Sequence, residues 1–320
     1  MERSGPWLHW PQVVKRIVLA SPRGWCAGVE RAVETVERVL EQRGAPVYVR
    51  KQIVHNAHVV RDLEARGAVF VDDVDEVPEG APVVFSAHGI APAVHAAAEA
   101  RGLATIDATC PLVSKVHAEA RHYAARGYTI VLVGHAGHEE VEGTMGEAPE
   151  AIVLVQSVEE AERLELPADR PLAYLTQTTL SVDETSAIVD VLRRRYPHVE
   201  APPKEDICYA TTNRQAAVKD MLGDVELLLV IGSRNSSNSN RLVEVASAGG
   251  VESHLVEDAG AIEEGWLDGV ESVGLTSGAS APESLVQDVL AWFRARGVED
   301  VRESPAPEDV AFRLPAAVRG

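Results

Sequence analysis

The segment Glu226-Leu-Leu-Leu-Val-Ile231-Gly-Ser-Arg-Asn-Ser-Ser-Asn-Ser-Asn-Arg241 decides the fold class. Its first part, Glu226–Ile231, is an apolar run with the length of one buried strand. A loop of serine and asparagine follows, and then the helical pattern Ser239–Ala248. Because a strand, a loop and a helix in this order form half of a βαβ unit, the segment predicts a parallel sheet covered by helices.

The same alternation extends over most of the chain. The other predicted strands are Arg16–Ala20, Val47–Arg50, Val83–Ser86, Ala104–Asp107, Thr129–Gly134, Ile152–Val155, Leu172–Thr176, Ser253–Val256 and Ser272–Thr276. The other predicted helices are Val29–Gln42, Ala57–Ala65, Ala91–Ala100, Val113–Ala125, Val182–Arg195, Asn213–Leu222 and Pro282–Arg296. We therefore expect an α/β protein with mostly parallel sheets and right-handed crossovers.

Only three cysteines occur, and they are about one domain length apart. Taken as boundaries, they predict three similar α/β domains and a tail, at residues 16–109, 110–207, 208–296 and 297–320. In the tail, Val310–Leu314 is apolar enough to add an edge strand. Ligand sites of open α/β sheets lie beyond the carboxyl ends of the strands, so three domains with those ends turned inward would share one central site.

Each of the three cysteines, Cys26, Cys110 and Cys208, stands just before or at the start of a predicted helix. An odd number of scattered cysteines is no disulfide framework, and such residues are usually small buried side chains. Unpaired N–H groups at a helix N-terminus lower a thiol's pKa and favour the thiolate, the form that binds metal. The repeated position therefore favours a shared soft centre, either zinc or an iron–sulfur cluster.

The overall charge excludes some classes of partner. Lys and Arg number 30 and Asp and Glu 49, which gives a net charge of −19. Such a chain repels nucleic acid and anionic membrane surfaces, so an anionic ligand must be held by local groups. No apolar run approaches the length of a membrane span, and the segment 1–16 lacks a secretory apolar core. The sequence thus predicts a soluble, cytoplasmic protein.

The serine- and asparagine-rich loop supplies such local groups. A flexible linker is the usual interpretation of this composition, but a linker is not expected between a strand and its helix. Hydroxyl and amide donors at a helix N-terminus suit phosphate oxygens, although neither a Walker A nor a GxGxxG motif is present. The segment Thr276–Pro282 repeats the arrangement, and Ser280 is positioned to cap the following helix.

Three histidines, His55, His88 and His138, each follow a predicted strand within a few residues. A lone histidine is usually a satisfied core or surface residue, and an HExxH zinc motif is absent. Imidazoles can nevertheless give charge-assisted hydrogen bonds to a diphosphate. Glu140 is the carboxylate near this set, and in an enclosed site it would serve as a proton donor, with Thr178 or Thr179 as a relay.

Several of these segments resemble motifs of the 4-hydroxy-3-methylbut-2-enyl diphosphate reductase family. The three cysteine motifs are Arg23-Gly-Trp-Cys-Ala-Gly-Val29, Asp107-Ala-Thr-Cys-Pro-Leu-Val113 and Asp206-Ile-Cys-Tyr-Ala-Thr-Thr-Asn-Arg-Gln215. The resemblance continues through Phe85-Ser-Ala-His-Gly89, Glu140-Val-Glu-Gly-Thr-Met-Gly146, Thr176-Gln-Thr-Thr-Leu-Ser-Val-Asp183, Asn235-Ser-Ser-Asn-Ser-Asn-Arg241 and Ser277-Gly-Ala-Ser-Ala-Pro282. The motifs run in the family's order over nearly the whole chain.

The resemblance implies a fold, a cofactor and a reaction. The fold is three α/β domains in a pseudo-threefold cloverleaf around a [4Fe-4S] cluster, with Cys26, Cys110 and Cys208 as ligands. The reaction is reductive dehydration of an allylic alcohol diphosphate to isopentenyl and dimethylallyl diphosphate, the last step of the non-mevalonate isoprenoid pathway. Two electrons arrive singly from a partner such as ferredoxin or flavodoxin.

The resemblance also assigns roles to the polar residues. The residues expected to be catalytic are Glu140, Thr178 and His138, of which Glu140 matches the proton donor and Thr178 supports the substrate hydroxyl and its proton path. The positions that match diphosphate-binding residues are His55, His88, Ser236, Ser237, Asn238 and Ser280, with His138 lining the pocket. Two residues depart from the family pattern, since Trp25 replaces phenylalanine and Glu139 replaces proline. Glu139 puts a further charge beside the proposed donor.

Two other functions are open on the residues alone. A zinc-dependent hydrolase of a phosphorylated small molecule would use Cys or His ligands and act without a reductant. A binding protein would close its lobes on an anion and keep its cysteines merely buried. Metal content and redox activity distinguish both from the cluster enzyme.

Overall fold

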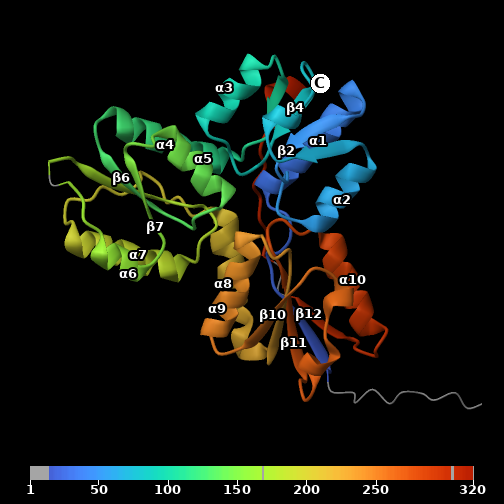
Figure 1. Cartoon of the computed structure of the whole chain (residues 1–320). Coiled ribbons are helices and arrows are strands. Elements are labelled where there is room, and N and C mark those ends of the chain that lie inside the picture. The colour runs from blue at the N-terminus through green and yellow to red at the C-terminus, as the bar shows by residue number, and fades with distance from the viewer. Residues whose placement is uncertain (1–13, 168, 304–305, 320) are drawn as a thin grey trace, which may run out of the picture.

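The computed structural model describes residues 14–167, 169–303 and 306–319, which form three α/β units around three sheets (Figure 1). The five-stranded sheet has the order β10 (Glu252–Val256), β9 (Leu227–Ile231), β11 (Ser272–Ser277), β1 (Arg16–Leu19), β12 (Asp300–Glu303). The four-stranded sheet has the order β3 (Ala68–Val71), β2 (Val47–Arg50), β4 (Pro82–Phe85), β5 (Ala104–Asp107). The three-stranded sheet has the order β7 (Ile152–Val155), β6 (Thr129–Val133), β8 (Leu172–Thr176). Every strand pair in these sheets is parallel, as predicted.

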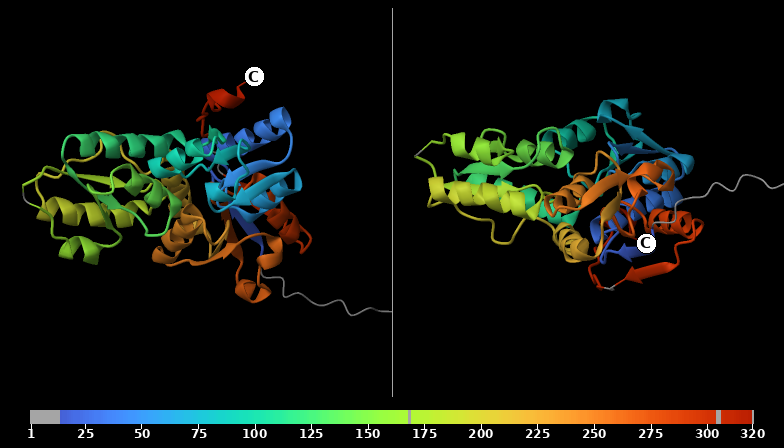
Figure 2. Two further views of the ribbon diagram at one scale, coloured as in Figure 1. Left: turned by 45° about the horizontal axis from the view of Figure 1, so that its top comes forward. Right: turned by 90° about the horizontal axis from the view of Figure 1, so that it is seen from below.

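Helices pack on both faces of each sheet (Figures 1 and 2). The five-stranded sheet is covered by α8 (Tyr209–Met221), α9 (Ser237–Ala248) and α10 (Glu283–Arg294). The four-stranded sheet is covered by α1 (Ala27–Arg43), α2 (Ala57–Ala65) and α3 (Pro92–Ala100). The three-stranded sheet is covered by α4 (Pro111–Ala125), α5 (Glu139–Glu147), α6 (Val158–Arg163) and α7 (Val182–Arg195). Sheets buried on both sides require continuous apolar strands, and all five residues of β9 are buried.

Each cysteine lies where the chain passes from one unit to the next. Cys26 follows β1 of the five-stranded sheet and is the N-cap of α1, which packs on the four-stranded sheet. Cys110 follows β5 and is the N-cap of α4, which packs on the three-stranded sheet. Cys208 follows that unit's α7 and is the N-cap of α8, which returns to the five-stranded sheet. The N-termini of α1, α4 and α8 therefore meet where the three units join.

Two strands of the five-stranded sheet, β1 and β12, are not where the sequence analysis placed them. The prediction placed residues 16–19 in the first domain, but β1 pairs with β11 and β12. The predicted edge strand at Val310–Leu314 is also wrong, because the edge is formed by β12, at Asp300–Glu303. The tail instead returns to the four-stranded unit, where Val318 is buried in the core. The other predicted domain boundaries stay predictions.

Four of the strands and α-helices were not predicted, namely β3, β12, α5 and α6. Helix α5 has no apolar period and contains Gly143 and Gly146, which disfavour a helix on propensity alone. A Cβ at Gly146 would lie 2.3 Å from that of Ala91, so the glycine is needed where α5 packs against the start of α3. Tertiary contact thus outweighs propensity here. Among the described residues no helix is long and apolar enough to cross a membrane. Residues 1–13, for which we predicted no secretory segment, lie outside the described part.

Candidate functional site

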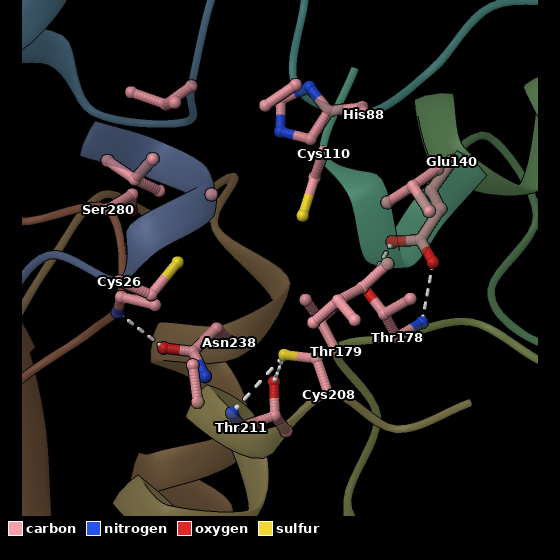
Figure 3. A pocket seen from close by; sticks show the side chains of 18 of the residues that line it. Cys26, His88, Cys110, Glu140, Thr178, Thr179, Cys208, Thr211, Asn238 and Ser280 are labelled. Atoms are coloured by element: carbon pink, nitrogen blue, oxygen red, sulfur yellow. Dashed lines mark hydrogen bonds between the residues drawn. The ribbon is translucent and has the colours of Figure 1, made fainter. Parts of the chain in front are cut away.

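One pocket between the units is lined by all the residues that we predicted to be catalytic, substrate-binding or metal-binding (Figure 3). Its empty volume is about 730 Å³, part of it open to solvent. The predicted residues that line it are Cys26, His55, His88, Cys110, His138, Glu140, Thr178, Cys208, Ser236, Ser237, Asn238 and Ser280. They belong to helix N-termini and to loops that follow strands, where open α/β sheets bind ligands.

The three cysteines are brought together by the N-termini of α1, α4 and α8. Gly28, in the first turn of α1, lies against two of the thiols. A Cβ at Gly28 would be 2.7 Å from Sγ of Cys110 and 3.7 Å from Sγ of Cys26. A larger residue would therefore fill the space between these sulfur atoms. The third thiol, of Cys208, accepts a hydrogen bond from the backbone N–H of Thr211 at 3.4 Å.

Two of the three thiols are less acidic than we predicted from their positions on the helices. Burial raises the pKa of Cys110 to about 12 and that of Cys208 to about 11. Backbone N–H groups, including that of Thr211, lower both pKa values, but by less than burial raises them. For Cys110 and Cys208, the expectation that the helix ends would produce free thiolates is therefore wrong. Three half-buried thiols that line one open space still fit a centre with sulfur ligands, because a bound soft cation displaces their protons.

Three histidine rings form another wall of the pocket. The rings of His55 and His88 are stacked, with centroids 4.0 Å apart. His138 meets both edge-on, at centroid distances of 5.5 and 5.9 Å. Burial lowers the pKa of His55 to about 3, that of His88 to about 4 and that of His138 to about 3. The rings are neutral in the free protein, and a bound anion would favour their protonated form.

Glu139 contacts this histidine cluster directly. Its Oε2 lies 3.1 Å from Nδ1 of His88 and accepts a hydrogen bond from the Ser86 hydroxyl at 3.4 Å. Burial raises the pKa of Glu139. His55, His88 and Glu139 each offer one possible metal-ligand atom, and these three atoms lie within 4.8 Å of one another. The zinc-hydrolase hypothesis predicts Cys or His ligands, so the two histidines fit it, and zinc also accepts a carboxylate. The same two histidines are those that we predicted to bind a diphosphate.

Glu140, in the first turn of α5, is enclosed by Thr178 (Figure 3). The backbone N–H of Thr178 donates to Oε1 at 2.5 Å, and its hydroxyl donates to Oε2 at 3.0 Å. Glu140 is 2% exposed, and burial raises its pKa to about 7, although the hydrogen bonds from Thr178 lower it. A carboxyl group that titrates near neutral pH can hold and deliver a proton. The geometry thus suits the predicted proton donor.

The serine- and asparagine-rich loop forms the N-terminus of α9. Ser236 is the N-cap, and its hydroxyl lies 3.4 Å from that of Ser280. The Ser280 hydroxyl donates to the carbonyl of His55 at 2.9 Å, so it connects this loop to the histidines. Our prediction that Ser280 caps the following helix is wrong, because Pro282 is the N-cap of α10.

Asn238 offers a free donor to the pocket. Its Oδ1 accepts a hydrogen bond from the backbone N–H of Ala279 at 2.7 Å. Its Nδ2 is buried and has no hydrogen-bond partner among the described residues. Burying an unpaired N–H group costs free energy, and a ligand oxygen at this position would recover that cost. The side chain therefore indicates a bound anion or carbonyl group.

Sequence reasoning missed several lining residues, of which Phe312 is the most distant along the chain. Phe312 reaches the pocket because the tail crosses it on the way back to the four-stranded unit. Glu308 pairs with Arg214 at 3.2 Å, and the carbonyl of Arg313 accepts from Arg31 at 2.8 Å. No local pattern predicts this path, because it depends on contacts between residues far apart in the sequence.

The fold and the pocket define a class of protein: a three-unit α/β protein that places three cysteines in one pocket with histidine, serine and asparagine side chains. The sequence profile of the LytB protein family matches residues 17–294. The chain therefore belongs to the LytB family. It is 60% identical over 311 residues to a 4-hydroxy-3-methylbut-2-enyl diphosphate reductase of Acidothermus cellulolyticus, with 97% of this chain and 92% of that one covered. A reductase of the same description from Nocardia farcinica is 58% identical over 307 residues, with 95% and 91% covered.

Solved structures agree with the fold. The chain matches the E-1-hydroxy-2-methyl-but-2-enyl-4-diphosphate reductase from Plasmodium falciparum with a TM-score of 0.92 and 38% identity. That match covers 95% of this chain and 97% of the other. A second structure, an (E)-4-hydroxy-3-methyl-but-2-enyl diphosphate reductase described as the terminal enzyme of the non-mevalonate pathway, matches with a TM-score of 0.61 and 31% identity. It covers 88% of this chain and 100% of that chain. The predicted family and the predicted three-unit α/β architecture are confirmed.

Proposed function

We propose that this chain reduces (E)-4-hydroxy-3-methylbut-2-enyl diphosphate to isopentenyl and dimethylallyl diphosphate, the terminal reaction of the non-mevalonate pathway. The names of its relatives give the substrate, and one observation in the pocket carries the assignment. Three cysteines at helix N-caps lie in the same pocket as a buried carboxyl group with a pKa of about 7. The reaction needs this combination, since two electrons and two protons must reach the substrate as water leaves.

Cys26, Cys110 and Cys208 would hold a [4Fe-4S] cluster, which when bound supplies the electrons singly and a Lewis-acidic iron. The protein around the thiols fits this group, because Gly28 leaves the space between two of them open. The electrons would come from a one-electron carrier such as ferredoxin or flavodoxin. We also propose that the enzyme works in the cytoplasm.

The remaining residues bind and protonate. Ser236, Ser237 and Asn238 at the N-terminus of α9 would bind diphosphate oxygens through hydroxyl and amide donors and the helix dipole. The three histidines would add charge-assisted hydrogen bonds once the anion raises their pKa. This arrangement explains how a chain of net charge −19 holds a diphosphate.

The proton is delivered from Glu140. Its neutral form donates to the leaving hydroxyl, and the Thr178 backbone N–H and hydroxyl then stabilise the carboxylate that forms. Thr178 holds the carboxyl group in one orientation at the wall of the pocket. Protonating the leaving oxygen turns hydroxide into water, a far better leaving group.

The test is made on protein purified without oxygen, by its visible spectrum and by iron and sulfide counts per chain. A brown protein with about four of each, bleached by dithionite and active on the diphosphate with a reductant, supports the proposal. A colourless protein that gains no iron on anaerobic reconstitution contradicts it. Zinc content and activity without reductant would then indicate the hydrolase, and diphosphate binding without turnover would indicate a binding protein.

A further inference from the structure

Three basic side chains, Arg31, Lys115 and Arg214, repeat one contact around the pocket. Each lies five or six residues after a cysteine, on the helix that this cysteine begins. Each donates hydrogen bonds to the last segment of the same unit, which lies just before the next cysteine. The third contact returns to the first cysteine, so the three contacts form a closed ring.

Arg31 makes this contact in the four-stranded unit. From α1, its Nη1 donates to the carbonyls of Ala108 and Thr109, both at 2.9 Å. These are the two residues before Cys110. Arg31 therefore connects the helix that begins at Cys26 to the segment that ends at Cys110.

Lys115 makes the contact in the three-stranded unit. From α4, its Nζ donates to the carbonyls of Lys204 and Glu205 and to Oδ1 of Asp206 at 2.8 Å. The Asp206 side chain is fully buried, and its Oδ2 accepts from the backbone N–H of Thr176 at 2.9 Å. The segment that leads into Cys208 is thereby attached both to α4 and to the end of β8.

Arg214 makes the contact in the five-stranded unit, and its side chain is fully buried. From α8, its Nη2 donates to the carbonyl of Gly24 at 2.6 Å and to that of Trp25 at 3.2 Å. These residues come directly before Cys26. A buried guanidinium is costly unless its donors are satisfied, and here most of them bind the segment that carries the cysteine.

A second threefold set of contacts attaches each cysteine to an anion-binding loop. The backbone N–H of Cys26 donates to the carbonyl of Ala279 at 3.2 Å, next to Ser280. The backbone N–H of Cys110 donates to the carbonyl of Ala87 at 2.9 Å, next to His88.

The backbone N–H of Cys208 completes this set by donating to the carbonyl of Thr178 at 3.0 Å. Each cysteine is thus attached to a pocket loop through its own N–H. A basic side chain also binds the segment before each cysteine. Two separate contacts, one at the cysteine N–H and one at the preceding residues, therefore hold the backbone at each cysteine.

We propose that Arg31, Lys115 and Arg214 are positioning residues, each of which fixes one edge of the triangle formed by the three cysteines. Arg31 fixes Cys26 relative to Cys110, Lys115 fixes Cys110 relative to Cys208, and Arg214 fixes Cys208 relative to Cys26. Since the three thiols belong to three junctions between units, no single helix or sheet sets their spacing. The contacts of the three basic residues set this spacing instead. In each unit, hydrogen bonds run from the helix that follows one cysteine to the segment that precedes the next cysteine.

The inference rests on the proposed metal centre, and its test uses the metal-loaded protein. Anaerobic holoenzyme is mixed with iodoacetamide, and alkylation of each cysteine is followed over time by mass spectrometry. In the wild type all three cysteines should be protected equally. Arg31→Gln should expose Cys110 first, and Lys115→Gln should expose Cys208 first. Arg214→Gln should expose Cys26 first.

The cysteine named for each variant should react roughly tenfold faster than in the wild type, the ratio expected for about 1.4 kcal/mol of lost local stability. The conservative variants Arg31→Lys, Lys115→Arg and Arg214→Lys keep the charge and should restore most of the protection. Arg38→Gln is the matched control, because Arg38 lies on α1 but, within the described part of the chain, its ion pairs are with Glu34 and Glu41 alone.

Equal exposure of all three cysteines in every variant, or first exposure of the cysteine on the variant's own helix, would overturn the inference. Such a result would mean that the basic residues merely stabilise the fold. If Arg214→Gln does not fold, the other two edges decide the question. A wild type that binds no metal would contradict the proposed function instead, so the two failures are distinguishable.

Discussion

The two halves of the pocket are built in different ways. The cysteine half repeats one local structure three times, a cysteine at the N-cap of a helix that begins a new unit. The other half, which we propose to bind the diphosphate and call the anion-binding half, combines three histidines after three strands with a hydroxyl-rich turn at the start of α9. Metal binding in the first half should need all three cysteines. In the second half, binding of the diphosphate should be shared among many hydrogen bonds, so that loss of one of them has a smaller effect.

Removal of one cysteine should have the largest effect. Cys110→Ser leaves two thiols and a hydroxyl, which is a poor ligand for a soft centre. Iron per chain should fall well below the wild-type value, and turnover should fall to background. Asn238→Ala in parallel should keep its iron, since it lies in the other half. Full iron content in Cys110→Ser would mean that Cys110 is no ligand.

Glu140→Gln should have the next largest effect, on turnover alone. The amide keeps the shape of the side chain but has no acidic proton, so kcat should fall about 10²- to 10⁴-fold with KM nearly unchanged. In the wild type, the protonated fraction of Glu140 decreases as pH rises through about 7, so kcat should decline above that pH. Glu142→Gln, an exposed position on the same helix, is the control. Near wild-type turnover in Glu140→Gln would assign the donor elsewhere.

Asn238→Ala should weaken substrate binding. The buried Nδ2 is assigned to a diphosphate oxygen, and a hydrogen bond to a charged group contributes about 1.5–3 kcal/mol. KM should therefore rise roughly 10- to 100-fold, with kcat little changed. Asn238→Asp keeps the oxygen that accepts from Ala279 but adds a charge, and it should bind at least as poorly. An unchanged KM would remove this loop from the binding site.

The contrast between the halves also separates what the sequence predicts from what it does not. Cys26, Cys110 and Cys208 were found from their positions before helices, because N-cap geometry is local. The pKa values of Cys110 and Cys208 were predicted wrongly, since burial is a tertiary property that a motif does not carry.

The remaining misses have the same origin. Helix α5 and the approach of Phe312 to the pocket depend on contacts between distant segments. The pairing of β1 with β11 likewise joins the two ends of the chain. The family motifs predicted which residues gather in the pocket, but the path of the chain between them required the structure.

Proton uptake should mark the anion-binding half. Burial holds the pKa of His55, His88 and His138 at about 3 to 4 in the free protein, so all three are neutral near pH 7. A bound diphosphate raises these values, and the complex should take up protons, so affinity should increase as pH falls toward 6. Calorimetry in two buffers of different ionisation enthalpy measures the uptake. Zero uptake would mean that the rings bind the anion in neutral form.

Glu139→Gln should have the smallest effect, and its direction tests how the histidine half works. The carboxyl group lies within hydrogen-bond distance of Nδ1 of His88, at 3.1 Å, and this contact orients the ring. Glutamine keeps a partner for the ring but loses the charge that favours the imidazolium, so KM should rise about 2- to 5-fold with kcat unchanged. Glu139→Pro, which suits the first position of α5, removes the contact and should raise KM at least as much. A fall in KM would instead mean that Glu139 acts mainly by repelling the diphosphate.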